Sequence, residues 1–378
     1  MQSIIRVNNL RLLNYRNHKN LKLHSNRNVI LLYGENGSGK TNILEAISIF
    51  FSSNGFRNAK ILSLIPKEFK NISNFGININ LLDGKNNFNI GLGLRENKES
   101  LKKIIRVDGQ DVVNKSFYEK YKIFWLIPSM NNLFISSSTD RRDFLDLMIK
   151  AYDLNHGKNL MVYKKLQRER LQILKKFYNV ETKNEWLDSI EKKMASVGII
   201  ISDTRRNFVK KMNEYSLNIN QKLPMINLEL TGEIDIAMNK NPALYVEESF
   251  LEKLKKNRDI DNLTGRTKLS ANRLDLRVYN RSNEQFVDNC STGEQKVIII
   301  CIVFLFIQVL KEKAPLKIIF LLDDIFAFLD KNYINLILDE LVELNIQTWI
   351  TNVNSDCIDK TWKSFKDIMF LNINDIKM

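Results

Sequence analysis

The sequence predicts an α/β fold, with a mixed sheet, an antiparallel β-subdomain and an inserted α-helical lobe. Three observations predict it. A glycine-rich loop at residues 34–41 joins an apolar run to a segment with helical spacing, residues 76–105 alternate between apolar and polar, and residues 155–221 have the spacing of long helices. A chain of 378 residues exceeds one ordinary core, so we expect two domains or one domain with a large insertion.

The glycine-rich loop begins directly after the apolar run Val29–Tyr33 and reads Gly34, Glu35, Asn36, Gly37, Ser38, Gly39, Lys40, Thr41. Strand, glycine loop and helix in that order give a G-x-x-x-x-G-K-[ST] match the context of a phosphate site. The loop N–H groups and the helix N-terminus favour the phosphates of ATP. Lys40 would reach the β- and γ-phosphates, and the Thr41 hydroxyl would ligate Mg²⁺. The alternative is a tight turn that carries a surface lysine.

Strands surround this loop in the predicted fold. Residues Ile4–Leu12 and Leu21–Leu23 flank a polar turn and predict an antiparallel hairpin, and the alternation over residues 76–105 predicts a β-meander. The run Ile123–Pro128 has the composition of a buried strand ended by proline. A helix is expected to follow, with Asp140 as its N-cap.

A second apolar run, Lys317–Leu322, ends in the carboxylates Asp323 and Asp324. A continuously apolar strand is typical of a parallel sheet, and ligands bind at the carboxyl ends of such strands. We expect Asp323 to hold Mg²⁺ and Asp324 to orient or deprotonate an attacking water. The alternative is that both aspartates cap a loop.

A polar segment, Cys290–Lys296, precedes the apolar run Val297–Leu310. Alone, Ser291 and Glu294 are best interpreted as a capping box. Together with the glycine-rich loop and the carboxylates, however, Ser291, Gly293, Glu294 and Gln295 indicate a helix start that faces a γ-phosphate. The apolar run is too short to span a bilayer and predicts a buried helix.

The helical lobe is predicted as an antiparallel helix pair followed by a further amphipathic helix near residues 250–256. Its second long helix carries a heptad seam with a polar interruption near Thr204, formed by Leu187, Ile190, Met194, Val197, Ile201, Phe208, Met212, Tyr215 and Ile219. Residues 158–211 hold fourteen Lys or Arg and six Asp or Glu. This charge fits either a solvated coiled-coil face or a DNA-contacting face that includes Lys164, Lys165, Arg205 and Arg206.

Composition limits the class of protein. A formal net charge of +14 suggests a polyanionic partner, although the chain is rich in Lys, Asn and Ile throughout. The cysteines Cys290, Cys301 and Cys357 form neither a metal pattern nor a disulfide framework. No signal peptide is recognisable at the N-terminus. We expect a soluble, cytoplasmic protein without a membrane partner.

These motifs together resemble a known ATPase head. The glycine-rich loop, the Ser-x-Gly-Glu-Gln segment, the Asp-Asp pair and the later Leu329-Asp330 are similar to the pattern of ABC-type, SMC and Rad50 proteins. Further segments resemble the RecF family specifically, from the first strand to Asp330: Asn14–His18, Trp125–Met130, Leu133-Phe134, Asp140–Asp146, Leu166–Leu174 and Cys290–Lys296.

The resemblance implies an ABC-type P-loop ATPase head made of residues 1–153 and 264–378, with the helical lobe at residues 154–263. It implies ATP and Mg²⁺ as cofactors, Lys40 and Asp324 as catalytic residues, and Arg16, Asn17 and Asp330 as further nucleotide contacts. ATP would join two heads, each loop facing the partner's Ser291. The homodimer would clamp duplex or gapped DNA at single-strand/double-strand junctions and help RecR/RecO-type mediators load recombinase in recombinational and replication-gap repair.

Three departures from the family pattern predict slow hydrolysis. Ser129 stands where a loop glutamine is usual, residues 264–269 lack the histidine and acid of a Gly-Pro-His-Arg-Asp segment, and no switch histidine occurs near Thr351. Hydrolysis would then act as a switch that releases DNA, rather than as a step of metabolism. The alternative function is an SMC/Rad50-like structural ATPase that tethers or organises DNA. Helices of this length predict a lobe rather than a tether, since two arms drawn from residues 158–220 reach roughly 50 Å.

Overall fold

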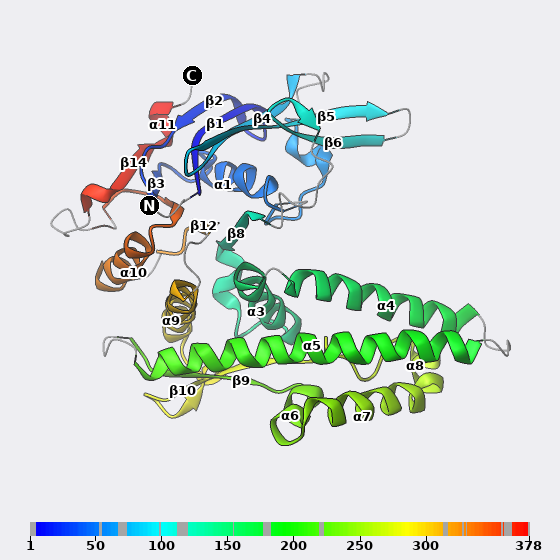
Figure 1. Cartoon of the computed structure of the whole chain (residues 1–378). Helices are drawn as coiled ribbons and strands as arrows, with labels where there is room; N and C mark the ends of the chain where they lie inside the picture. The colour runs from blue at the N-terminus through cyan, green and yellow to red at the C-terminus, as the bar shows by residue number, and fades with distance from the viewer. Residues whose placement is uncertain are drawn as a thin grey trace. The chain divides into compact units, whose positions relative to one another are not determined.

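The fold was obtained as a computed structural model, which describes residues 5–52, 55–66, 74–97, 100–111, 120–153, 155–176, 183–218, 223–312, 317–326, 329, 331–356, 358 and 365–376. Two compact units make up the chain (Figure 1). The first combines Met1–Asn131 with Leu310–Met378, and the second is Asn132–Val309.

A parallel sheet carries the glycine-rich loop in the first unit. Its strand order is β14-β3-β13-β12-β8, and every pair in it is parallel. The strands are β3 (Val29–Tyr33), β8 (Lys122–Leu126), β12 (Ile318–Asp323), β13 (Gln347–Asn352) and β14 (Ile368–Asn372). β12 and β13 are buried along their whole length, as the apolar run before Asp323 predicts.

An antiparallel sheet is the second layer of this unit, with the order β2-β1-β4-β5-β6-β7. It consists of β1 (Ile5–Tyr15), β2 (His18–His24), β4 (Gly76–Asp83), β5 (Asn86–Asn97), β6 (Ser100–Val107) and β7 (Gln110–Asp111). The predicted hairpin and meander are therefore confirmed. One apolar core joins β1, β4 and helix α1 (Lys40–Ile49) to the parallel sheet, with Leu12, Ile79, Leu44 and Trp349 among its buried residues.

Short elements and one helix complete the first unit. They are η1 (Ile61–Leu64), η3 (Pro128–Asn132), α10 (Lys331–Leu344), η5 (Phe365–Asp367) and α11 (Ile373–Ile376). Residue Ser129 lies in η3, directly after β8, and is exposed.

The second unit is mainly helical. Its elements are α3 (Ser138–Tyr152), α4 (His156–Lys176), α5 (Lys183–Leu217), β9 (Ile226–Leu230), α6 (Glu233–Lys240), α7 (Ala243–Lys256), α8 (Arg258–Thr264), β10 (Leu276–Asn280), β11 (Gln285–Phe286), η4 (Val287–Asn289) and α9 (Thr292–Lys311). β9, β10 and β11 form a small antiparallel sheet. The two compact units divide the chain at residues 131/132 and 309/310, so β9 and its partner β10 both belong to the second unit. The domain boundaries 153/154 and 263/264 stay a prediction.

The predicted helix pair corresponds to α4 and α5, which pack along one another (Figure 1). α6 and α7 also pack on α5, and α8 packs on α4, so the pair is built into a larger helical layer. Gly198 allows the close approach of α7, because a Cβ atom there would lie 2.8 Å from the ring of Phe250. Tyr163, Met194, Ile201 and Phe250 are among the buried residues of this core.

Buried arginines were not predicted for this core. At the polar interruption of the α5 seam, Arg205 has no exposed surface, and its Nε and Nη2 atoms each donate to a carboxylate oxygen of Asp146 at 2.8 Å. His156 contacts the same carboxylate at 2.8 Å. The expectation that Arg205 contacts DNA is therefore wrong: its charge is neutralised inside the second unit.

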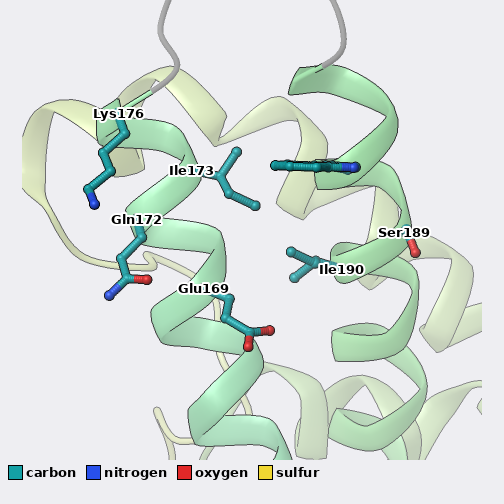
Figure 2. Close-up of a pocket in the computed structure, with 7 residues that line it drawn as sticks. Glu169, Gln172, Ile173, Lys176, Ser189 and Ile190 are labelled. Carbon is teal, nitrogen blue, oxygen red and sulfur yellow. The ribbon is translucent and has the colours of Figure 1, made fainter.

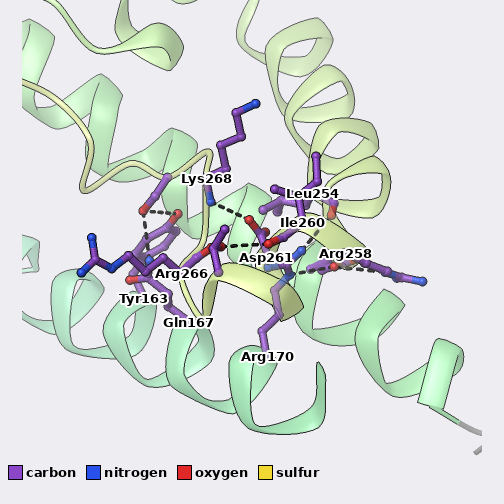
Figure 3. A network of polar contacts seen from close by, with 12 residues as sticks. Tyr163, Gln167, Arg170, Leu254, Arg258, Ile260, Asp261, Arg266 and Lys268 are labelled. Carbon is purple, nitrogen blue, oxygen red and sulfur yellow. Dashed lines mark hydrogen bonds and ion pairs between the residues drawn. The ribbon is translucent and has the colours of Figure 1, made fainter. Parts of the chain in front are cut away.

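Arg170 is the second buried arginine, and Figure 3 shows its contacts. It donates to Glu191 at 2.8 Å, to Asp261 at 2.7 Å and to the carbonyl of Leu254 at 2.8 Å. Asp261 also accepts the N–H of Lys268 at 2.7 Å. The network thereby holds the segment after α8, where the family pattern predicts Gly-Pro-His-Arg-Asp, against α4 and α5.

Helix α9 contains the apolar run before the Lys317 strand. In the part of the chain that the structure describes, only this helix is long and apolar enough to cross a membrane, over Thr292–Leu310, and most of that stretch is buried. The predicted buried helix is confirmed, since residues 298–307 are all at most 6% exposed.

Candidate functional site

The glycine-rich loop has backbone geometry that requires its glycines. Gly37 and Gly39 have φ angles of 80° and 103°, which L side chains rarely adopt. A Cβ atom on Gly39 would lie 2.5 Å from the ring of His18 and 2.7 Å from the amide of Asn17. The loop therefore curls tightly between β3 and α1, as the motif predicts.

Lys40 lies at the first position of α1 and points back into the loop. Its Nζ atom donates to the carbonyl of Gly34 at 2.6 Å and to that of Glu35 at 2.8 Å. Burial lowers the pKa of Lys40, while Asp324 and Asp323 act in the opposite direction. The two carboxylates thus favour the charged ammonium, which is the form that binds phosphate oxygens.

Asp323 connects the loop helix to the strand ends of the parallel sheet. Its Oδ1 atom accepts hydrogen bonds from the hydroxyls of Thr41 at 2.9 Å and Thr351 at 2.7 Å. Residues 41 and 323 are 282 positions apart in the chain, so the fold places the two predicted metal ligands in contact. In the described residues no group of three or more His, Cys, Asp or Glu could hold a metal. A hydroxyl and a carboxylate do fit Mg²⁺, which takes most of its oxygen ligands from phosphates and water.

Asp324 follows at the carboxyl end of β12, with φ at 50°. Its N–H donates to the hydroxyl of Thr351 at 2.9 Å. Burial and then the neighbouring charge of Asp323 raise the pKa of Asp324, and Lys40 lowers it. A carboxylate with a raised pKa is a better proton acceptor, which fits the predicted role of Asp324 as a base.

Thr351 is a site residue that the sequence reasoning missed. It is the second-last residue of β13, which lies beside β12. Thr351 could have been predicted as a site residue because its hydroxyl lies at the carboxyl end of a strand, where ligands bind in parallel sheets.

The turn between β1 and β2 packs against the loop. Asn17 donates to the carbonyl of Gly37 at 3.3 Å and accepts from Asn42 at 2.8 Å. Arg16 makes a two-point contact with the buried carboxylate of Glu45, at 2.9 and 2.7 Å. Asn17 thus lies at the loop, Arg16 is engaged by α1, and their contact with nucleotide stays a prediction.

Two further supports of the loop were not predicted. Glu45, on α1, also accepts a hydrogen bond from the hydroxyl of Tyr15 at 3.0 Å. The His18 ring donates from Nε2 to the carbonyl of Gly39 at 3.1 Å, since a carbonyl can only accept. Glu45 and His18 are buried although both side chains are polar, so these contacts could not be predicted from the pattern of the sequence.

The segment before α9 lies in the second unit and forms a capping box. Ser291 Oγ and Glu294 Oε2 are 2.8 Å apart, and the Ser291 N–H donates to the same carboxylate at 2.8 Å. Gln295 is buried and donates to the carbonyl of Cys290 at 3.1 Å. A Cβ atom on Gly293 would meet no other atom within 4 Å, so the space on the side of a side chain is open there.

Ser291 and Glu294 thus form the capping box that their spacing predicts. Their contact with a γ-phosphate stays a prediction. Asp330 and Cys357 lie outside the described residues. Cys290 and Cys301 are free thiols.

Comparison with known proteins places the chain in a family. The family model described as RecF/RecN/SMC N terminal domain matches residues 6–372. The DNA replication and repair protein RecF of Rickettsia typhi is 33% identical over 362 residues, which cover 93% of this chain and 96% of that protein. The RecF of Rickettsia prowazekii is also 33% identical, with the same coverage. The chain belongs to the RecF family.

Solved structures agree with this assignment at the level of the fold. A structure of the recombination mediator protein RecF-ATP in the RecFOR pathway has a TM-score of 0.77 at 22% identity and covers 96% of both chains. The Smc head domain of Pyrococcus furiosus has a TM-score of 0.51 at 16% identity, covering 98% of this chain and 94% of that one. The predicted ABC-type head fold and the resemblance to the RecF family are both confirmed.

Proposed function

We propose that this RecF-family protein binds DNA in an ATP-dependent manner during recombinational and replication-gap repair. The observation that carries the proposal is the contact of Thr41 with Asp323, which brings the glycine-rich loop and the carboxyl end of β12 into one site. That pairing is what nucleotide binding in a P-loop ATPase requires. Family membership supplies the setting of DNA replication and repair.

The chemistry of the site is slow ATP hydrolysis. Lys40 and the loop N–H groups bind the phosphates, and Thr41 with Asp323 would hold Mg²⁺, which neutralises charge on the phosphates. Asp324 orients the attacking water and takes its proton. Ser129 has a shorter side chain than the glutamine usual at this position, so the site senses the γ-phosphate weakly and turnover is slow.

The active species is an ATP-dependent homodimer in which each loop meets the helix start at Ser291 of the other subunit. Such a dimer clamps DNA at single-strand/double-strand junctions and assists recombinase loading with RecR/RecO-type mediators, in the cytoplasm. Hydrolysis releases the DNA. The mediator partners are suggested by the RecFOR pathway in which the similar RecF structures are described.

A structural tether of the SMC/Rad50 type is disfavoured by the size of the helical lobe. The longest helix, α5, has 35 residues and is therefore about 50 Å long. It packs against α4, α6 and α7 rather than extending away as an arm.

Sedimentation velocity of wild-type protein and the Lys40→Met variant, with and without ATP and gapped DNA, tests the nucleotide switch. We expect ATP to convert the wild type to a dimer that binds gapped DNA, and Lys40→Met to stay monomeric and to lose hydrolysis. Lys22→Met, which changes an exposed lysine on β2, is the matched control and should behave as wild type. Wild-type hydrolysis in Lys40→Met would refute the proposed nucleotide site.

Mixing two inactive variants tests the shared site. A Lys40→Met subunit paired with a Ser291→Arg subunit retains one intact composite site, so the mixture should recover part of the hydrolysis that each variant lacks alone. Absence of recovery in heterodimers shown to form would mean that each chain hydrolyses ATP by itself.

A further inference from the structure

The helix pair of the second unit has an open groove on its surface. It has a volume of about 430 Å³ and lies between the last turns of α4 and the first turns of α5. Figure 2 shows Ile173 of α4 and Ile190 of α5 pointing into the space between the two helices. Trp186, one turn before Ile190, also lines the groove and is 62% exposed. The groove therefore has an apolar lining in which the aromatic ring of Trp186 is largely exposed.

Polar groups rim this apolar lining on both sides. The amide of Gln172 comes from α4 and the hydroxyl of Ser189 from α5. Each of these groups can both donate and accept a hydrogen bond. A groove that receives an amphipathic helix of a partner protein is continuously hydrophobic, with anchors at helical spacing. The present groove instead combines one flat aromatic ring with adaptable polar groups, and the charged side chains of Glu169 and Lys176 complete its lining.

The surface around the groove is rich in basic side chains. On the exposed surface of α4, residues 164–176 carry five basic side chains and the single carboxylate of Glu169: Lys164, Lys165, Arg168, Lys175 and Lys176. Glu169 is itself paired with Lys165 at 3.6 Å. Arg170, the sixth basic residue, is buried and neutralised by Glu191 and Asp261.

On the α5 side the acids Glu185 and Asp188 are exposed, and Asp188 is paired with Lys255 and Arg258. Exposed Lys192 and Lys193 follow Ser189 by one turn on α5, so cations lie beside the groove on both helices and are most numerous on α4. An exposed aromatic ring beside a row of cations is the arrangement that binds single-stranded nucleic acid, with the base stacked and the phosphates on the cations.

We propose that the groove between α4 and α5 is a subsite for one unpaired nucleobase of a DNA strand, stacked on Trp186, with neighbouring phosphates on the lysines of α4. This subsite rests on the proposed function, because it gives the protein a direct contact with the single-stranded part of a gap. Stacking tolerates every base, so the subsite distinguishes unpaired from paired DNA rather than one sequence from another.

Binding of an oligothymidylate and of its abasic counterpart to the full-length protein tests this inference. Trp186→Ala should weaken oligothymidylate binding about tenfold, and Trp186→Phe should weaken it less, because stacking on an aromatic side chain contributes roughly 1–3 kcal/mol per base. Binding of the abasic oligomer should be the same in all three proteins. The wild type should also show quenching of tryptophan fluorescence that Trp186→Phe lacks.

Tyr245→Ala is the matched control, since Tyr245 is an aromatic residue of the same unit, on α7, with 61% exposure. It should bind both oligomers as the wild type does. Wild-type affinity of Trp186→Ala for oligothymidylate, or an equal loss for the abasic oligomer, would overturn the subsite. Loss of mediator-protein binding with unchanged DNA binding would overturn it in favour of a protein-docking groove.

Gapped DNA separates this inference from the function on which it rests. If wild type binds gapped DNA with ATP and Trp186→Ala binds it equally well, only the subsite is refuted. If the wild type shows no ATP-dependent binding of gapped DNA, both the subsite and the proposed function are refuted.

Discussion

Replacing Arg205 by methionine should destabilise the second unit rather than weaken DNA contacts. The side chain is fully buried and makes three hydrogen bonds, two to Asp146 at 2.8 Å and one to the carbonyl of Ala271 at 2.6 Å. Methionine keeps the length and apolar volume but leaves the carboxylate of Asp146 with His156 alone. Removing one partner of a buried ion pair costs about 3–5 kcal/mol of unfolding free energy.

Thermal unfolding followed by circular dichroism measures this loss. For a domain the size of the second unit, about 3–5 kcal/mol lowers the unfolding midpoint by roughly 6–20 °C. Arg206→Met is the matched control, because the guanidinium of half-buried Arg206 donates to the uncharged side chain of Asn239. It should change the unfolding free energy by no more than about 0.5 kcal/mol. An Arg205→Met protein as stable as wild type would refute the reasoning.

The difference in stability between Arg205→Met and wild type should depend on pH. Burial raises the pKa of Asp146, but hydrogen bonds from His156 and Arg205 outweigh it and hold the pKa well below the usual range. A depressed pKa stabilises the fold above the ordinary value of about 4 and loses that contribution as pH falls through the folded pKa. Without Arg205 the depression is smaller, so the midpoints of variant and wild type should converge as pH falls below about 4.

Three further predictions concern the nucleotide site and DNA. Thr351→Val removes the hydroxyl that donates to the Asp323 carboxylate and accepts from the backbone N–H of Asp324, and it should lower the rate of hydrolysis more than the affinity for a fluorescent ATP analogue. Because burial and the adjacent carboxylate raise the pKa of Asp324, hydrolysis should fall as pH drops through that raised pKa, above the ordinary value of about 4, while Asp324→Asn should form a persistent ATP-bound dimer without this pH dependence. Lys164→Glu, on the exposed face of α4, should reduce the slope of log DNA affinity against log salt by about 1 or more and leave ATP binding unchanged, whereas an unchanged slope would exclude this face from DNA contact.

Local patterns of the sequence predicted the strands and the phosphate loop well. The glycine-rich loop, the hairpin, the meander and the apolar strand before Asp323 each follow from short-range periodicity or a spaced motif, so they needed no knowledge of tertiary contacts. The antiparallel and parallel strands then meet in one core because their apolar faces have nowhere else to be buried.

What could not be predicted depends on partners far apart in the chain. Thr351 reaches Asp323 only through strand pairing, and the polar interruption of the α5 seam is filled by Arg205, whose partner Asp146 lies 59 residues earlier. The predicted N-cap of α3 was also wrong: Ser137 caps the helix, and Asp140 is the third helical residue of its capping box. Periodicity reports which positions face inward, but it does not report which charges meet there.

The position of β3 in its sheet has a consequence for synthesis of the protein. Both neighbours of this strand, β13 and β14, come from residues 347–372, and the N–H of Gly34 donates to the carbonyl of Val353 at 3.1 Å. At a translation rate of about 5–20 residues per second, β13 is synthesised roughly 15–60 s after β3. A ribosome-bound or truncated chain that ends before residue 347 therefore presents an apolar strand with both edges unpaired. Such a chain is a target for chaperones and proteases, and a nucleotide site forms only when the whole chain has been made.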